Sequence, residues 1–131
     1  MIRILFICVG NAARSQMAEG FARTLGRDRF EVFSAGSKPA GKVAPLAIEV
    51  MKEKNIDISK AKPKGFNEIP LDNIDYAVSM GCEKVCPFVP AKQYIEWDIT
   101  DPEGKTISDY RMVRDDIELK VKDFIQSIKG E

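Results

Sequence analysis

The spacing of apolar residues changes several times along the chain, and each change marks a new element. Residues 2–7 form a short apolar run with Arg3 as its one charged residue, as in a strand that is covered on both faces. From about residue 15, apolar side chains recur every three or four positions, which predicts an amphipathic helix. Residues 30–34 return to a short strand pattern. The first part of the chain therefore indicates strand, helix and strand in succession.

The same alternation continues through the middle of the chain. Apolar positions within residues 46–51 predict one face of a second helix, with Pro45 tolerated in its first turn. Residues 59–70 have the composition of a loop. Residues 74–80 and 93–99 predict a third and a fourth strand, because both are apolar runs bounded by Gly, Pro, Asp and Asn.

A last helix is predicted to begin near residue 108. Alternating strands and helices favour an α/β sandwich with a parallel sheet, and right-handed crossovers then place the loops after the strands at one edge. No linker or repeat divides the 131 residues, so we expect a single domain over residues 1–131. The apolar stripe of the last helix consists of Tyr110, Val113, Ile117, Val121, Phe124 and Ile128.

Charge and composition narrow the range of partners and chemistries. The 20 lysine and arginine residues balance 20 aspartate and glutamate residues, which predicts neither a nucleic-acid nor a membrane partner. The apolar N-terminal run is short and contains Arg3, unlike a membrane anchor or a signal peptide, so we expect a cytoplasmic protein. We also expect a monomer. Three cysteines suit a reducing compartment. Histidine is absent, which excludes Cys-His and Ser-His-Asp catalysis and imidazole zinc sites, and we expect no cofactor.

A candidate anion-binding loop joins the first predicted strand to the first predicted helix. Between Cys8 and Arg14 it offers main-chain N–H groups, the positive end of a helix and a guanidinium to a tetrahedral oxyanion. These surroundings favour the thiolate form of Cys8, a nucleophile that needs no histidine. Ser15 can cap the helix, donate to the thiolate or assist its departure; a merely buried cysteine is the alternative. The loop consists of Val9, Gly10, Asn11, Ala12, Ala13 and Arg14.

Three segments together carry a family resemblance. Residues 8–20, residues 34–36 and Asp101-Pro102 resemble, in this order, the low-molecular-weight protein tyrosine phosphatase superfamily and, within it, the thioredoxin-coupled arsenate reductases. Gln16 and the later pair of cysteines are similar to the reductase branch. The resemblance implies a three-layer sandwich whose four-stranded parallel sheet has the order 2-1-3-4.

The resemblance also implies a relay of three thiols. Cys8 would attack arsenate, Cys82 would attack the Cys8 adduct and release arsenite, and Cys86 would take over Cys82. Thioredoxin would then reduce the resulting disulfide. The separation of Cys82 and Cys86 is shorter than is usual in the family. Structural thiols, or a soft-metal site completed by Cys8, are the alternatives.

Asp101 follows the last predicted strand and is the candidate general acid. An Asp-Pro turn is the alternative, and Asp98 is the reserve candidate. Phosphatases of this superfamily typically carry tyrosines after the Asp-Pro, whereas Glu103 and Gly104 follow here. This difference favours the reductase over the alternative function, a phosphatase that hydrolyses phosphomonoesters through a phosphocysteine at Cys8.

A potassium site is a further implication of the resemblance. Asn11, Glu19 and Ser34 match three ligand positions of a potassium ion that some of these reductases bind. The fourth position falls in residues 60–64, Lys-Ala-Lys-Pro-Lys, so a lysine takes the cation's place. We therefore expect weak or absent potassium dependence. A loop-bracing role is the alternative for Glu19, and we expect Trp97 to be a core residue.

Overall fold

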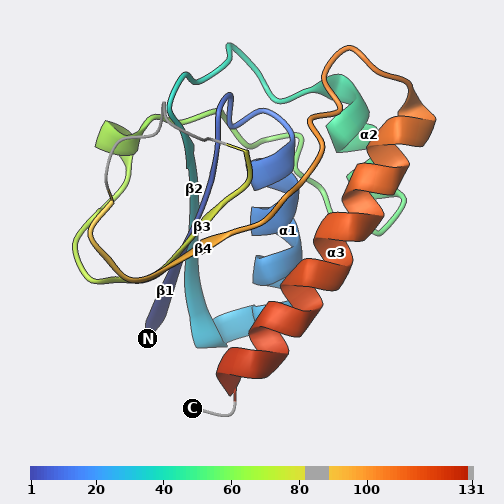
Figure 1. Ribbon diagram of the computed structural model, residues 1–131. Helices are drawn as coiled ribbons and strands as arrows, with labels where there is room; N and C mark the ends of the chain where they lie inside the picture. The colour runs from blue at the N-terminus through green and yellow to red at the C-terminus, as the bar shows by residue number, and fades with distance from the viewer. Residues whose placement is uncertain (82–88, 130–131) are drawn as a thin grey trace.

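The computed structural model describes residues 1–81 and 89–129, and a single parallel sheet forms its centre (Figure 1). The order of the strands is β2-β1-β3-β4, and all three pairings are parallel. The predicted α/β class and strand order are confirmed. The strands are β1 (Ile2–Cys8), β2 (Phe30–Gly36), β3 (Ile74–Ser79) and β4 (Ala91–Glu96).

β1 is central in the sheet because β2 and β3 pair with its two sides. Leu5 lies between Phe33 and Ala77, and Ile7 between Ala35 and Ser79. Residues 4–7 are fully buried, which accounts for the continuous apolar run.

Three helices cover one face of the sheet in the described part of the chain. Figure 1 shows α1 (Arg14–Gly26) and α3 (Ile107–Lys129) side by side on this face, with α2 (Pro45–Lys52) beyond them. Their buried residues form one large cluster with the sheet. Its members include Phe6, Met17, Phe21, Val50, Met51, Ile117 and Val121.

A second, smaller cluster covers the opposite face. Leu5, Ile7 and Ala77 point to this side of the sheet. Phe66, from the short 3-10 helix η2 (Phe66–Glu68), packs against them together with Leu71. The segment predicted as a loop therefore supplies one of the outer layers.

β4 begins two residues earlier and ends three residues earlier than predicted. Ala91 pairs with Ile74, which extends the start of the strand. Trp97 makes one further main-chain bond, its N–H donating to Ser79 O at 2.8 Å, and its ring meets Phe124 edge-on with centroids 6.1 Å apart. Trp97 thus packs against the core, as expected.

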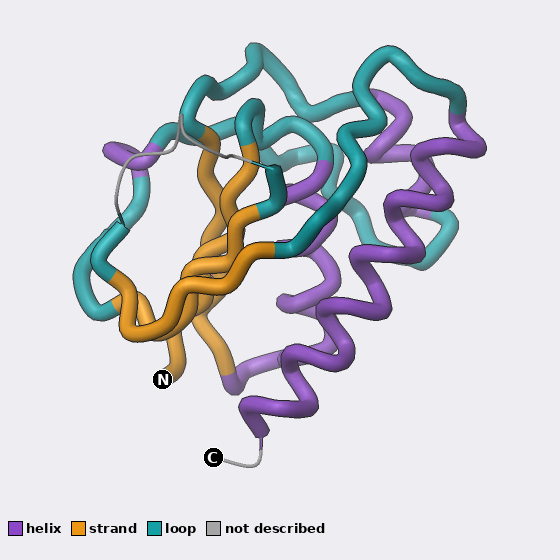
Figure 2. The backbone as a smooth tube through the Cα atoms, viewed as in Figure 1, coloured by secondary structure: helices purple, strands orange, loops and turns teal. Residues whose placement is uncertain are grey.

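The carboxyl ends of β1, β3 and β4 lie at one edge of the sheet (Figure 2). This edge is the carboxyl end of the parallel strands, where ligands bind in such folds. No helix in residues 1–81 and 89–129 combines the length and the apolar character needed to cross a membrane.

Candidate active site

The loop of residues 9–13 turns three of its carbonyl oxygens away from its centre. These oxygens accept hydrogen bonds of 2.9 Å from main-chain N–H groups of the segment 38–44. In a trans peptide the C=O and the following N–H point in opposite directions, so the N–H groups of Gly10, Asn11 and Ala13 face the interior of the loop. The pairs are Lys38 N with Val9 O, Ala40 N with Gly10 O, and Ala44 N with Ala12 O.

The end of β2 presses against the outside of this loop. A Cβ atom on Gly36 would lie 2.5 Å from Val9 O and 2.9 Å from Asn11 N, so no larger residue fits without moving main chain. Gly36 N also donates to Lys64 O at 2.8 Å. The end of β2 therefore supports the loop directly, and the segment around residue 64 binds the end of β2.

Cys8 is a free, buried thiol at the end of β1. Its Sγ lies 2.9 Å from Ser15 Oγ, and Ser15 Oγ accepts a hydrogen bond of 2.7 Å from Asn11 Nδ2. Of the three roles predicted for Ser15, the structure contains the hydrogen-bond contact with the Cys8 thiol. Ser15 does not cap α1, because Ala13 is the N-cap residue and makes no side-chain cap bond.

The Arg14 guanidinium is held between the ends of two strands. Its Nη1 donates to Met80 O at 2.7 Å and to Ile99 O at 3.4 Å, and its Nη2 lies 3.4 Å from Asp101 Oδ2. Gly81 has a φ of 84°, and a Cβ there would clash with Arg14 Nη1. Glycine is thus required both by backbone conformation and by the close guanidinium.

Cys8, Arg14 and Asp101 line one pocket of about 310 Å³. Asp101 Oδ1 accepts a hydrogen bond of 3.0 Å from Glu103 N, so the turn geometry considered as its alternative is present as well. The second carboxylate oxygen faces Arg14. Asp98 lines a different pocket, with Gly81 and Trp97.

Tyr110 also lines the Cys8 pocket, although its sequence pattern places it in the apolar stripe of α3. Burial, together with the charges of Asp101 and Glu103, raises the pKa of Tyr110. Its hydroxyl therefore stays protonated and can donate a hydrogen bond. The signal in the sequence was a hydroxyl-bearing residue in the first turn of the helix that follows Asp101.

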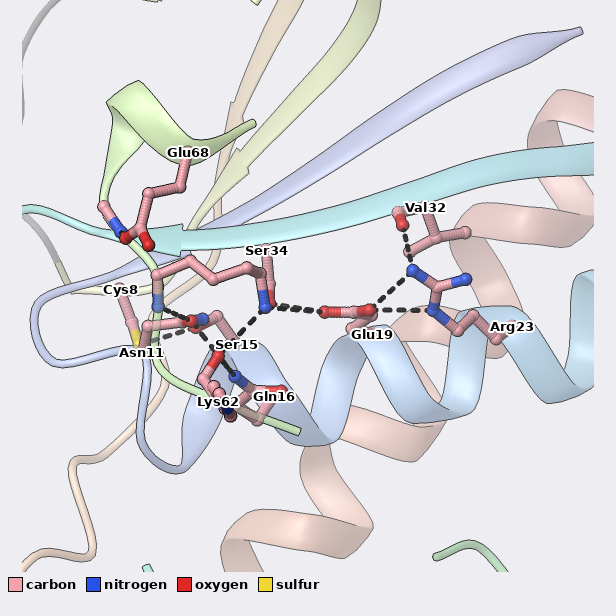
Figure 3. Close-up of polar contacts among 12 residues, drawn as sticks. Cys8, Asn11, Ser15, Gln16, Glu19, Arg23, Val32, Ser34, Lys62 and Glu68 are labelled. Carbon is pink, nitrogen blue, oxygen red and sulfur yellow. Dashed lines mark hydrogen bonds and ion pairs between the residues drawn. The ribbon is translucent and has the colours of Figure 1, made fainter. Parts of the chain in front are cut away.

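The residues matched to a potassium site lie beside a lysine. Ser34 Oγ donates to Glu19 Oε1 at 2.5 Å (Figure 3). Lys64 Nζ lies 3.9 Å from the same oxygen. Glu19 Oε2 pairs with Arg23 at 2.7 Å. Asn11 Oδ1 instead accepts a hydrogen bond from Lys64 N at 2.8 Å.

The predicted relay cysteines, Cys82 and Cys86, lie outside the described residues. Gly81 is the last described residue before Cys82, and it contacts Arg14. Across the described ranges, no group of three or more Cys, Asp or Glu side chains is arranged to hold a metal ion.

Comparison with known proteins gives consistent matches over nearly the whole chain. Residues 3–131 match the family described as low molecular weight phosphotyrosine protein phosphatase. A protein of Staphylococcus saprophyticus named arsenate reductase 2 is 41% identical over 124 residues, which cover 92% of this chain and 94% of that protein.

Solved structures give the same picture. An arsenate reductase in the phosphate binding state superposes with a TM-score of 0.87 and 34% identity, covering 98% of this chain and 99% of that one. The thioredoxin-dependent arsenate reductase of Corynebacterium glutamicum gives a TM-score of 0.81 and 33% identity, covering 98% of this chain and 62% of that one.

Proposed function

The chain belongs to the low molecular weight phosphotyrosine protein phosphatase family, and we propose that this member reduces arsenate to arsenite. The observation that carries the proposal is the position of Arg14. Its guanidinium lies in the Cys8 pocket and binds Met80 O, two residues before Cys82. A phosphatase needs an anion loop and an acid, whereas a reductase also needs a second thiol close to the first. Because Arg14 ties Met80 to the Cys8 pocket, we propose that Cys82, two residues further along the chain, supplies this second thiol.

The first step is nucleophilic attack on bound arsenate. The inward N–H groups of the loop and the Arg14 guanidinium hold the oxyanion, which places arsenic next to Cys8 Sγ. A sulfur–arsenic bond forms while an arsenic–oxygen bond breaks. Asp101 delivers a proton to the departing oxygen, which leaves as water.

The second step reduces arsenic. The Cys82 thiolate attacks Cys8 Sγ and forms a disulfide, and the electron pair of the sulfur–arsenic bond stays with arsenic. Arsenic(V) becomes arsenic(III) and leaves as arsenite. Cys86 then attacks Cys82, which frees Cys8 and leaves a Cys82–Cys86 disulfide. A thioredoxin-like dithiol reduces that bond; thioredoxin dependence is named for the Corynebacterium glutamicum relative.

The test is arsenate-dependent consumption of NADPH through thioredoxin reductase and thioredoxin. Cys8→Ser should abolish turnover, because no nucleophile remains. Cys86→Ser should release one equivalent of arsenite and accumulate a Cys8–Cys82 disulfide, visible by peptide mass mapping. Normal multiple turnover by Cys86→Ser with thioredoxin would show that the relay is wrong.

Hydrolysis of an aryl phosphate without a thiol donor tests the alternative function. The pocket is shared by both reactions, so slow hydrolysis is compatible with the proposal. Efficient hydrolysis together with no arsenate reduction would replace the reductase by a phosphatase. Stoichiometric retention of arsenite or a soft metal, with no turnover of either substrate, would instead indicate a binding protein that uses the three thiols.

A further inference from the structure

A chain of hydrogen bonds, buried from Gln16 onward, leads from the segment 62–64 to the sulfur of Cys8 (Figure 3). Gln16 Nε2 donates to Lys62 O at 3.1 Å and to Asn11 Oδ1 at 3.0 Å. Asn11 continues the chain to Ser15, which contacts Cys8. The side chains of the three linking residues are out of solvent, with exposed fractions of 1% for Gln16 and 0% for Asn11 and Ser15.

Main-chain groups determine the orientation of the two amides in this chain. Lys62 O can only accept, so Gln16 must present its NH₂ group to it, and the same group faces Asn11 Oδ1. Lys64 N can only donate, which requires the oxygen of Asn11 on that side. Asn11 therefore presents its NH₂ group to Ser15. The Cys8 thiolate can only accept, so the single proton of Ser15 Oγ is the donor in its contact with Cys8.

We propose that Gln16 is a positioning residue for the reaction: it holds the Asn11 amide in the orientation that commits the Ser15 hydroxyl to the Cys8 thiolate. Gln16 acts through Asn11 and Ser15. The inference rests on the proposed function only in taking Cys8 as the nucleophile.

Two substitutions at Gln16 should have graded effects. Gln16→Glu replaces an NH₂ group that serves two acceptors by a carboxyl group with at most one proton. A carboxylate at residue 16 repels Asn11 Oδ1 and favours the flipped amide, which only the Lys64 N–H then opposes. In the flipped amide the Asn11 oxygen faces Ser15, and Ser15 donates to Asn11 instead of Cys8. Gln16→Met keeps the length of the side chain and leaves Lys64 N as the remaining donor to Asn11 Oδ1.

The experiment measures the rate at which iodoacetamide alkylates Cys8 between pH 5 and 9. The Cys82→Ser/Cys86→Ser background leaves Cys8 as the remaining thiol of the three in the sequence. Gln16→Glu should lower the rate at pH 6 by about tenfold, because a hydrogen bond to the thiolate is lost, and should leave the alkaline plateau unchanged. Gln16→Met should lower it by about threefold, because one of two donors remains. The charged and titratable groups that line the Cys8 pocket are the same in all variants: Arg14, Lys42, Asp101, Glu103 and Tyr110. Gln16→Glu adds one carboxyl group outside that lining, and the uncharged Gln16→Met variant separates the loss of the hydrogen bonds from the effect of that charge.

A double-mutant cycle separates positioning from a general structural effect. Ser15→Ala should slow alkylation at pH 6 as Gln16→Glu does, and the combined variant should show no further loss. Gln126→Glu, the same change at an exposed position of α3, should leave the profile unchanged. Additive losses in the cycle, or a parental profile for folded Gln16→Glu, would overturn the inference. If Gln16→Glu fails to fold, a parental profile for Gln16→Met overturns it. Alkylation needs no arsenate, so failure of the reductase proposal would leave this readout intact.

Discussion

Lys64 contributes two different groups to the surroundings of the anion loop. Its main-chain N–H donates to Asn11, while its ammonium donates to Lys62 O at 3.1 Å and lies 3.9 Å from a Glu19 carboxylate oxygen. One residue thus links the main-chain support of the loop to the charge balance beside it. An ammonium at this distance repels a second cation. It also gives Glu19 the neighbouring positive charge that a bound potassium ion would otherwise supply.

We therefore predict that turnover does not respond to potassium. Arsenate reduction in potassium and sodium buffers of equal ionic strength should agree within about twofold, since the lysine charge is already present. Lys64→Gln keeps the main-chain donor and removes the ammonium, so potassium should accelerate this variant more than the parent. Lys92→Gln, an exposed lysine on β4, is the matched control. Strong activation of the parent by potassium would contradict the assignment.

At the scale of elements, a cluster of charges joins α2 to α3. Glu53, directly after α2, accepts hydrogen bonds from Arg111 at 2.8 Å and from Arg114 at 2.6 Å. Arg114 also donates to Val50 O at 2.9 Å, inside the α2 turn. Hydrogen bonds from the two arginines lower the pKa of Glu53 from 4.5 to about 2.

This shift predicts how stability depends on pH. A carboxyl whose pKa is lower in the folded state stabilises it above the ordinary pKa, and the effect is lost as pH falls from about 4.5 to about 2. Glu53→Gln should therefore reduce the free energy of unfolding at pH 7, and the difference from the parent should shrink below pH 4.5. Urea denaturation at pH 7, 5, 4 and 3 measures it, with Glu96→Gln on β4 as the control. An equal difference at every pH would contradict the prediction.

The elements also explain which parts of the site the sequence could predict. Cys8 and Arg14 bound one strand–loop–helix junction, so local pattern was enough to bring them together. Asp101 follows from topology, because parallel strands end at the same edge. The contacts of Gln16 with Lys62 and of Asn11 with Lys64 depend on the path of a loop without periodicity, and no local pattern predicts them.

Gln16 and Tyr110 illustrate a second limit of sequence patterns. Gln16 lies on α1 at a buried position, where one of its two hydrogen-bond partners, Lys62 O, comes from the distant segment 62–64. Tyr110 fits the apolar stripe of α3, yet it faces the pocket because the loop after β4 ends there. In both cases the helical pattern is compatible with a buried side chain. The role of that side chain in the site depends on a contact with a distant segment, which the pattern does not predict.

At the scale of the whole molecule, the anion loop is a meeting point of distant segments. The loop contacts the end of β2, residues 38–44 and Lys64, and Arg14 adds the ends of β3 and β4. A ligand bound at this point contacts groups that come together only in the folded chain. Its binding free energy is therefore coupled to global unfolding.

We predict that inorganic phosphate stabilises the parent against urea, with a gain of about 2.7 kcal/mol when its concentration is 100 times its Kd. Arg14→Ala should lose most of this phosphate-dependent gain, because the guanidinium in the Cys8 pocket supplies the fixed positive charge. Arg14→Ala also loses its bonds to Met80 O and Ile99 O, so each variant is compared with itself, with and without phosphate. Arg23→Ala, on the same helix but exposed and paired with Glu19, should retain the full gain. A full gain in Arg14→Ala would mean that phosphate binds elsewhere, and the pocket would lose its role as the oxyanion site.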